Sequence, residues 1–348
     1  MLSRVADSIF WIARSMERAE NLARLLQANH QLMLDAGAGQ QEEAGFWKPI
    51  LRTTGDEEAF LAAGHSVTAE EVGAFFSEDR NNPNSIVNCI RSARENARMV
   101  RDQISDELWQ CLNQLYHQIT SPGARALRQS DPNEYYDQVM RESYLFQGIA
   151  RSTMVRSEGW LFLQMGTYLE RGDQTSRLVD ACSDVPPVLP PQPKANPLRW
   201  ASLLHSCSAY HAFHEGSNHL DPPRIIAFLF LSDEFPRSVR YAVREVDRAL
   251  RTLTARRPEL SSEPVRVVGR LRADLDYGTV EEIFSEGLHL YIDRLQQNLN
   301  RVGQAIFETF VFYADLLPID APPDTTILPA EAWHAGQPDP ASQQQQQQ

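Results

Sequence analysis

Apolar residues recur at alternating spacings of three and four along the first thirty residues of the chain. The positions are Leu2, Val5, Ile9, Ile12, Met16, Ala19, Ala23 and Leu26, and Met33 continues the series. This spacing places one apolar stripe along one side of an α-helix. We therefore predict a helix of about thirty residues (one apolar stripe of period ~3.6) at the start of the chain.

The same periodicity returns after a region of glycine-rich and acidic turns at residues 37–83. Within that region, Thr68 followed three residues later by Glu71 is typical of the start of a short helix. A second long helix is predicted to begin after Asn84 or Ser85 and to end near Thr120. Its apolar stripe consists of Ile90, Ala93, Ala97, Val100, Ile104, Leu108, Cys111 and Leu115.

Helical patterns continue through the rest of the chain. A third helical stretch covers residues 134–182, with a break or bend expected near Gly148 or Gly159. The prolines between residues 186 and 197 predict a stiff connector that no helix crosses. Beyond it, helices are predicted near 197–214, 222–232, 236–256 and 263–276. Thr279 and Glu282 form a capping box that starts a last long helix, which ends near Asp315.

No segment shows the sustained alternation of a strand, so the fold class predicted is all-α. We expect a single large helical bundle of six or more main helices with two quasi-repeated halves. The helical domain is placed at residues 1–317, with halves at about 1–183 and 197–317 and the Pro-rich connector at 186–197. Residues 318–348 are Pro-rich and polar, end in six glutamines, and are predicted to be a disordered tail.

One short motif occurs twice, as SMERAENLARLL at residues 15–26 and as YLERGDQTSRLVD at residues 168–180. Alignment of 10–26 with 163–179 makes four identical pairs, with an offset of 153 residues. They are Glu17 with Glu170, Arg18 with Arg171, Arg24 with Arg177, and Leu25 with Leu178. Most other positions are conservative, such as Ala13 with Gly166. The match favours an internal duplication.

The spacing inside each copy constrains the partners of its charged residues. Glu17 and Arg24 are seven residues apart, about 10.5 Å along a helix axis, which is too far for an ion pair within one helix. We predict that the two copies pack antiparallel, so that Glu17 faces Arg177 and Glu170 faces Arg24. Two interpretations stay open: a buried ion-pair network that fixes helix register, or a polar pocket that binds a ligand.

Several segments resemble the alpha-E domain family of bacterial proteins. They are SRVADSIFWIARSMERAENLARLL, SIVNCIRSARENARMVRDQIS, YLERGDQTSRLVD, SCSAYHAF and FPRSVRYAV, and the resemblance covers roughly residues 1–316. It implies an all-helical domain with recurring Glu-Arg signatures and an uncharacterised function. It also implies ATP-grasp ligase-like and transglutaminase-like proteins as partners. The Glu-Arg positions carry over as signature residues, and the resemblance implies no catalytic residue.

Two series of arginines add candidate binding surfaces. Arg91, Arg94, Arg98 and Arg101 form one row on a helix, where guanidinium groups can bind the phosphate or carboxylate of an acidic or peptide ligand. The alternative is that they pair with this protein's own acids, including Glu95 and Asp102. A second series is interleaved with Glu245 and Asp247 and is predicted to be a solvated face. Its members are Arg237, Arg240, Arg244, Arg248 and Arg251.

Composition narrows the classes of function. The chain has 33 Lys and Arg against 46 Asp and Glu, a formal net charge of −13, which argues against non-specific binding of nucleic acid. No apolar run is long enough for a membrane span. The four cysteines are scattered, as is typical of reduced thiols in a cytosolic protein, and we predict a cytoplasmic location.

The sequence offers only weak candidates for catalysis or metal binding. Four histidines lie between residues 205 and 219, but only one Glu-x-x-His step is present, at Glu286 and His289, where a helical di-iron site needs two. Cys207 and His211 are four residues apart, with no orienting third group. Glycine-rich phosphate loops are absent from the sequence. We expect no metal and no cofactor.

These observations favour a non-catalytic accessory or binding module. It would act with an ATP-grasp ligase-like or transglutaminase-like partner in peptide or amide-bond synthesis or modification. The alternative is an enzyme in its own right, in which Glu17 and Glu170 form a carboxylate pair for acid–base chemistry. Such a pair needs pKa values that its environment moves apart.

Overall fold

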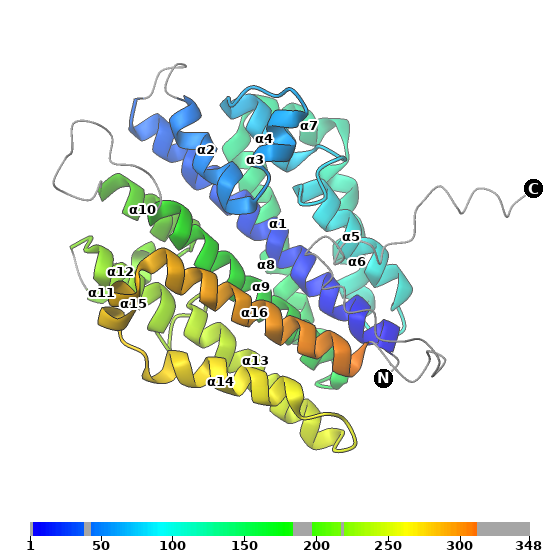
Figure 1. Cartoon of the computed structure of the whole chain (residues 1–348). Coiled ribbons are helices and arrows are strands. Elements are labelled where there is room, and N and C mark those ends of the chain that lie inside the picture. Colours follow the sequence, from blue (N-terminus) through cyan, green and yellow to red (C-terminus); the bar gives the residue numbers. More distant parts are fainter. Residues whose placement is uncertain (1–2, 38–42, 184–196, 217–218, 312–348) are drawn as a thin grey trace, which may run out of the picture. The chain divides into compact units, whose positions relative to one another are not determined.

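The computed structural model describes residues 3–37, 43–183, 197–216 and 219–311 (Figure 1). These residues form helices and the turns that join them, and none of the described residues belongs to a strand. The prediction of an all-α fold is confirmed. The tail predicted from residue 318, and the predicted connector apart from Pro197, lie outside the described residues.

The first predicted helix is confirmed as α1 (Ser3–Asp35). Three shorter helices follow it, and they are α2 (Glu43–Thr54), α3 (Glu57–Ala62) and α4 (Ala69–Ser77). Thr68 caps α4 as predicted, since its hydroxyl oxygen accepts a hydrogen bond from the backbone N–H of Glu71 at 3.3 Å.

Two of the predicted long helices are each divided into two helices. In place of one helix to Thr120, the chain forms α5 (Ile86–Met99) and α6 (Asp106–Ile119). The Ser105 hydroxyl accepts from the backbone N–H of Leu108 at 3.1 Å and starts α6. Apolar periodicity missed the break because both helices bury their stripes in the same core.

The last predicted helix is divided in the same way, into α15 (Val280–Glu286) and α16 (Leu288–Phe310). The predicted capping box of Thr279 and Glu282 is present and starts α15. Gly287 separates the two helices with a φ of +96°, a backbone conformation that a side chain disfavours.

The third helical stretch is broken at residues 154–157, just before Gly159, whereas Gly148 lies inside a helix. The remaining helices occupy the regions predicted for them, except that α7 was not expected and that 197–214 forms two helices. They are α7 (Pro122–Ser130), α8 (Pro132–Thr153), α9 (Glu158–Ser183), α10 (Pro197–Ser206), α11 (Tyr210–Gly216), α12 (Pro222–Leu231), α13 (Val239–Arg256) and α14 (Glu263–Tyr277).

Two central helices, α1 and α9, organise the bundle. They run side by side in the same direction (Figure 1), and each packs more extensively against the other than against any further helix. α1 also contacts α5 and α8, and α9 also contacts α13 and α16. Because neighbours surround them, both helices are buried around most of their circumference, which explains why their apolar stripes are broad.

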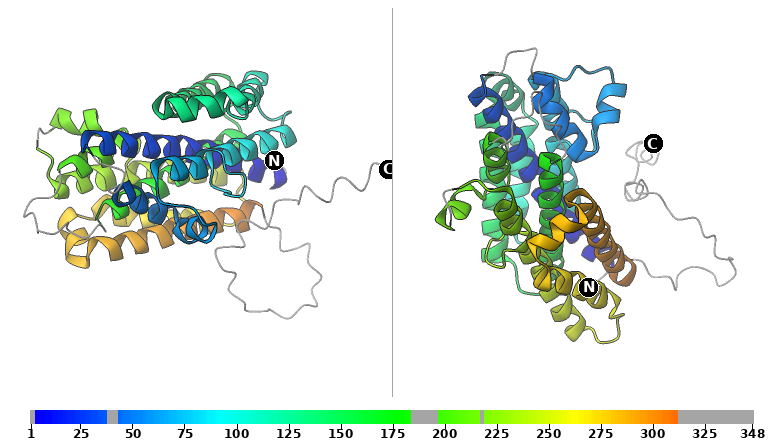
Figure 2. Two further views of the ribbon diagram at one scale, coloured as in Figure 1. Left: turned by 90° about the horizontal axis from the view of Figure 1, so that it is seen from above. Right: turned by 60° about the vertical axis from the view of Figure 1, so that its left-hand side comes forward.

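The packing around α1 is repeated around α9. α5 packs on α6 and α6 on α8, while α13 packs on α14 and α14 on α16. The view from above in Figure 2 shows α8 and α16 at opposite sides of the bundle, with α1 between them. Ser85 caps α5 and Ser238 caps α13, again 153 residues apart. We therefore group α9 with the helices that follow it, whereas the sequence prediction grouped residues 158–183 with the helices before them.

None of the described helices has both the length and the apolar character required to cross a membrane.

Candidate functional site

α1 and α9 approach each other closely at Gly166. A Cβ atom at this glycine would lie 2.4 Å from the backbone oxygen of Phe10 and 3.0 Å from the Cβ of Ala13. Nearer the start of α9, a Cβ at Gly159 would lie 3.1 Å from Ile9. The contacts therefore advance in the same order along both helices, so the two signature copies pack parallel. The antiparallel prediction is wrong.

The Glu of each signature copy pairs with the Arg of the other copy. Arg171 donates from Nε and Nη2 to the two carboxylate oxygens of Glu17, both at 2.8 Å. Arg18 donates in the same way to Glu170, at 2.7 Å from Nε and 3.2 Å from Nη2. Each fork is bidentate, which is the strongest arrangement of a guanidinium and a carboxylate. We call these four residues, Glu17, Arg18, Glu170 and Arg171, the Glu-Arg centre.

On the Glu17 side, other polar side chains complete the centre. Arg237, from the turn before α13, donates to Glu17 at 3.0 Å and also to Glu20. Gln147 of α8 donates to Glu20 at 2.9 Å. Arg24 pairs with Glu20, four residues earlier on α1, and has only 4% of its side chain exposed. This side is closed to solvent.

On the Glu170 side, Arg14 donates to the carboxylate at 2.6 Å and Gln174 donates to it at 3.2 Å. Arg177 pairs with Asp173, four residues earlier on α9, at 2.8 Å. The side chain of Arg177 is 33% exposed, and that of Arg18 is 24% exposed. This side therefore opens to solvent, unlike the Glu17 side.

Burial and charge together fix the ionisation of the two signature carboxylates. Burial alone would raise the pKa of Glu17, but Arg171 and Arg237 lower that pKa to about 2. Burial opposes Arg18 and Arg14 in the same way at Glu170, and the net effect holds the pKa of Glu170 well below its ordinary value. Both groups are carboxylates at neutral pH and accept several N–H donors each, which leaves them poor proton acceptors.

The structure brings six of the candidate residues together but changes their partners. Glu17, Arg18, Arg24, Glu170, Arg171 and Arg177 all lie along the contact of α1 with α9. The predicted pairs of Glu17 with Arg177 and of Glu170 with Arg24 are wrong. Arg24 and Arg177 each bind an acid one turn earlier on their own helix, a spacing of four that the prediction did not weigh.

Sequence reasoning missed Arg237, which it assigned to a solvated face. The signal was present, because Asn82-Pro83-Asn84-Ser85 and Phe235-Pro236-Arg237-Ser238 are also offset by 153 residues. Both segments lead into a helix capped by their serine. Asn84 accepts a hydrogen bond from Arg18 at 3.1 Å, whereas Arg237, at the equivalent position, binds Glu17.

The arginine row at residues 91, 94, 98 and 101 lies on α5 and in the turn after it, away from the centre. Arg94 donates to Asn113 at 2.9 Å and lies over the ring of Tyr116, 4.7 Å from its centroid. Arg98 pairs with Glu95 at 2.9 Å, and Arg101 comes within 3.9 Å of Asp106.

Arg91 is exposed. Pairing with the protein's own acids therefore occurs as the alternative predicted, although Asp102 binds Gln103 rather than an arginine.

The weaker candidates for chemistry do not form a site in the described part of the chain. Burial raises the pKa of Cys207 to about 12, so its thiol is a poor nucleophile at neutral pH. His205 stacks on Tyr210, His214 lies against the same ring at a tilt of 34°, and His289 contacts Asp180 at 2.8 Å. Among the described residues, no three His, Cys, Asp or Glu side chains gather in an arrangement able to hold a metal ion.

Comparison with known families identifies the signature. Residues 1–311 match the Alpha-E family, which is described as a predicted alpha-helical domain with a conserved ER motif. The chain belongs to this family. Glu17-Arg18 and Glu170-Arg171 are two ER pairs in this sequence, and they are the residues that exchange ion pairs in the centre.

The curated relatives are uncharacterised proteins. The chain is similar to one protein of Mycobacterium bovis and to two of Mycobacterium tuberculosis, each 23% identical over 351 residues. The match covers 94% of this chain but 39% of each relative, so the chain spans about two fifths of their length. No solved structure matches the chain.

Proposed function

We propose that the chain is a non-catalytic accessory or binding module for an ATP-grasp ligase-like or transglutaminase-like partner. In this proposal it acts in the cytoplasm, in the synthesis or modification of peptide or amide bonds. The observation that carries the non-catalytic part is the saturation of Glu17 and Glu170 by arginine. A general base must accept a proton, and a carboxylate whose pKa is about 2 does so poorly at neutral pH.

The partner class rests on the family resemblance alone, whereas the length of the relatives bears on the accessory role. The relatives are much longer than this chain, so in them the helical domain is part of a larger polypeptide. A helical domain that is joined to further polypeptide in its relatives fits an accessory role beside another domain or protein.

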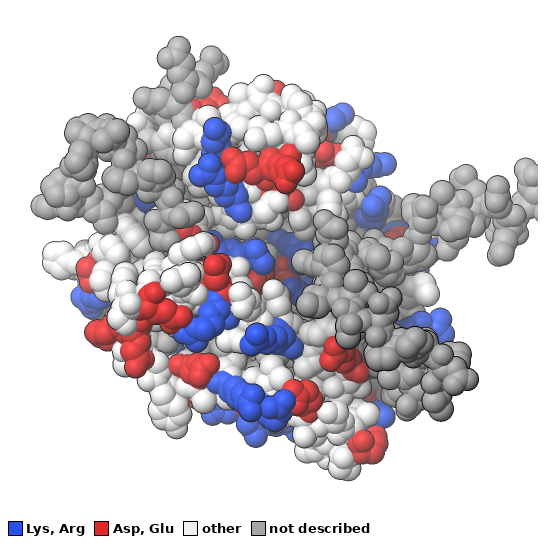
Figure 3. Space-filling view, in the orientation of Figure 1, with Lys and Arg blue, Asp and Glu red and all other residues white. Residues whose placement is uncertain are grey.

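The surface supports recognition of a partner more than chemistry. Acidic and basic side chains are interleaved over the face shown in Figure 3, including the part formed by α2 and α3 and the part formed by α16. Arg91 and Arg98 on α5, with Arg101 in the turn after it, add an exposed cationic row. Mixed charge of this kind steers a complementary partner and sets its orientation.

The alternative, an enzyme that uses Glu17 and Glu170 as an acid–base pair, is disfavoured by the same geometry. Acid–base work needs one member of the pair to hold a proton near neutral pH, and that requires pKa values moved apart. Here arginines move both pKa values in the same direction, downward.

The experiment combines the purified full chain with an ATP-grasp ligase-like protein from the same organism, at low ionic strength. We expect co-elution on size-exclusion chromatography and a product, identified by mass spectrometry, whose yield rises when both proteins are present. Charge reversal in Arg91→Glu/Arg98→Glu should weaken the association. Arg141→Glu/Arg301→Glu, at exposed positions of α8 and α16, reverses the same number of charges; it is the matched control and should leave the association unchanged.

Two outcomes would contradict the proposal. Failure of the two proteins to associate would remove the accessory role. Turnover by this chain alone, abolished in Glu17→Gln but kept in a core variant of equal stability such as Leu112→Ala, would support the catalytic alternative instead.

A further inference from the structure

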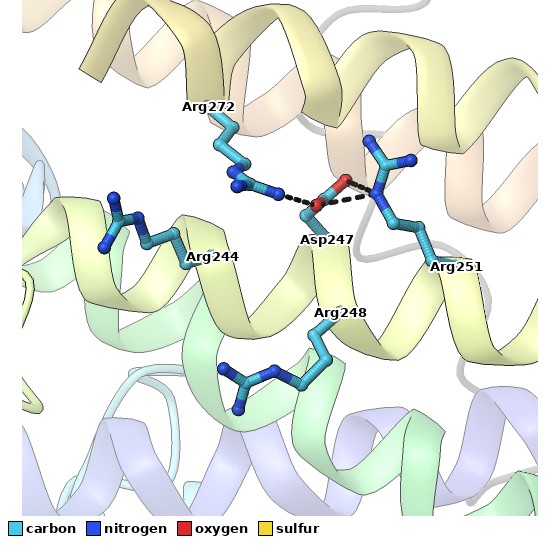
Figure 4. A pocket seen from close by; sticks show the side chains of 5 residues that line it. All are labelled: Arg244, Asp247, Arg248, Arg251 and Arg272. Atoms are coloured by element: carbon cyan, nitrogen blue, oxygen red, sulfur yellow. Dashed lines mark hydrogen bonds and ion pairs between the residues drawn. The ribbon is translucent and has the colours of Figure 1, made fainter. Parts of the chain in front are cut away.

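A second group of arginines lies on α13 and α14, in the second repeat, whereas the arginine row at 91–101 belongs to the first repeat. A pocket of about 380 Å³ lies between α13 and α14 and is lined by Arg244, Asp247, Arg248, Arg251 and Arg272. Figure 4 shows that Arg272 enters from α14 and that the other four side chains come from α13. Four of the five lining residues are cations, although the chain as a whole is acidic.

Asp247 acts as the anchor of this pocket. Its side chain is 2% exposed, and it accepts from Nε of Arg251 at 2.9 Å and from Nη1 of Arg272 at 2.7 Å (Figure 4). One buried carboxylate thus orients two guanidinium groups from two helices. Because Arg251 uses only Nε for this contact, both of its terminal nitrogens keep their N–H donors, with no acceptor among the described residues.

The other two arginines, Arg244 and Arg248, also pair with acids of this chain. Arg248 pairs with Glu245 at 2.7 Å and is 73% exposed. Arg244 pairs with Asp276 at 2.8 Å and comes within 3.3 Å of Asp233, and Arg272 also contacts Asp276. Arg248 is largely exposed, so its pair with Glu245 contributes little net free energy and an oxyanion with several charges can replace it. Asp276 is 14% exposed and is shared by Arg240, Arg244 and Arg272, so Arg244 keeps its acid.

The first repeat shows that this arrangement is not a requirement of the fold. Arg98 is the equivalent of Arg251, and Arg94 is the equivalent of Asp247, at the offset of 153 residues. Arg94 lies over an aromatic ring instead of anchoring other arginines. The second repeat therefore has a buried acid where the first has a cation, and this acid collects the guanidinium groups around a pocket.

We propose that the pocket between α13 and α14 binds a multivalent oxyanion, either a phosphoryl group or a set of clustered carboxylates. The two terminal nitrogens of Arg251 present a fork of N–H donors that matches the planar pairs of oxygen atoms in both chemistries, and the exposed Arg248 adds a second guanidinium group. Arg272 adds positive charge while its Nε and Nη1 stay on Asp276 and Asp247. The proposal does not depend on the accessory role proposed above, since it concerns a different surface and a ligand rather than a protein.

The test titrates the full chain with inorganic pyrophosphate, and separately with a tricarboxylate such as tricarballylate, in isothermal calorimetry at constant ionic strength. Binding of pyrophosphate alone identifies the phosphoryl group, and binding of the tricarboxylate alone identifies carboxylates. Arg248→Gln/Arg251→Gln should weaken whichever binding is seen by about tenfold or more, which corresponds to the loss of one or two charge-assisted hydrogen bonds.

The matched control is Arg125→Gln/Arg141→Gln on α7 and α8, which removes the same charge from exposed positions outside both the pocket and the arginine row at 91–101. It should leave the affinity within about twofold, since only distant screened charges change. Equal weakening by both double variants would show a diffuse effect of net charge and overturn the proposal. The absence of binding by either probe at millimolar concentration would overturn it as well.

Discussion

The Glu17 side and the Glu170 side of the centre contain the same kinds of residue at equivalent positions, yet one is closed and the other is open. Glu20–Arg24 and Asp173–Arg177 are corresponding pairs, one turn beyond each signature. Arg24 donates a hydrogen bond to the Tyr144 hydroxyl of α8, and Gln147 of α8 donates one to Glu20, the partner of Arg24. The side chain of Arg177, in contrast, is 33% exposed.

Burial, rather than the motif, therefore sets the role of each arginine. An arginine in the closed half must stay paired, because an unpaired charge there has no water to solvate it. An arginine in the open half can exchange its partner for water or for a ligand at little cost. The two sides should therefore behave alike at their buried carboxylates and diverge at Arg24 and Arg177.

The two signature carboxylates are where the sides should agree. Glu17→Gln leaves Arg171 buried without its counter-ion and leaves Arg237 with Glu20 alone. Glu170→Gln removes the fully buried carboxylate that Arg14 and Arg18 share. Each should lower the free energy of unfolding by about 3–5 kcal/mol, the range for breaking a buried pair. Urea denaturation monitored by circular dichroism measures the loss.

A matched control for this prediction is Glu134→Gln on α8, whose carboxylate pairs with Arg141 at the surface. Its loss should be about 0–1 kcal/mol, as for exposed pairs. A loss below about 1 kcal/mol for Glu17→Gln or Glu170→Gln, within the range of surface pairs, would show that the centre is not a buried network.

Acid should weaken both sides. The pKa of Glu17 is about 2 in the folded chain and 4.5 ordinarily, so this group stabilises the fold above about pH 4.5. That stability, on the order of 3 kcal/mol, is lost as the pH falls from about 4.5 towards 2. Glu170 adds to the loss in the same direction, since its pKa is also lowered.

The measurement is urea denaturation of the wild type and of Glu17→Gln over a series of pH values. The stability gap between them should be wide near neutral pH and should narrow below about pH 4.5, because the variant has no carboxyl group to protonate. A gap that stays constant to about pH 3 would contradict the lowered pKa.

Arg24 and Arg177 are where the sides should diverge. Arg24→Gln leaves Glu20 buried with one cation fewer and should cost about 3 kcal/mol. Arg177→Gln changes a partly exposed pair and should cost less than about 1 kcal/mol. The two variants serve as controls for each other under identical denaturation conditions, and equal losses would remove the distinction between a closed and an open side.

The sequence alone was sufficient for the class of fold and for the identity of the central residues. Period-3.6 patterns predicted nearly every helix, and the repeated motif pointed to Glu17 and Glu170. The direction of packing was out of reach of this reasoning. The observed parallel packing brings Glu17 to Arg171 and Glu170 to Arg18. The predicted antiparallel packing paired the same carboxylates with other arginines. Both directions give each buried carboxylate an arginine, so the need for a counter-ion does not choose between them.

Other features depended on the turns between helices. Arg237 reaches the centre from the turn before α13, a place that helical periodicity does not describe. The breaks at Ser105 and Gly287 are set by one cap and one positive φ, while the apolar stripe runs on across them. Such local backbone features decide which side chains enter a site even where the core pattern is clear.

The final prediction concerns the contact that holds the two sides in register. Ala13 on α1 corresponds to Gly166 on α9, but only the alanine side has room for a Cβ atom. At Gly166 that atom would meet backbone, the oxygen of Phe10 at 2.4 Å, and backbone cannot rotate away. Gly166→Ala should therefore push α1 and α9 apart and lower the free energy of unfolding by about 1–3 kcal/mol, as overpacking does.

Gly148 on α8 provides the matched control, because it is also helical and a Cβ there would meet nothing within 4 Å. Gly148→Ala should raise the stability by about 0.5–1 kcal/mol through the better helix propensity of alanine. The two substitutions add the same methyl group. Opposite signs of their changes in the free energy of unfolding would therefore separate the effect of the close approach of α1 and α9 from that of helix propensity. If Gly166→Ala were also stabilising, the two helices would not be in contact at that level, and the exchanged ion pairs of the centre would need a different explanation.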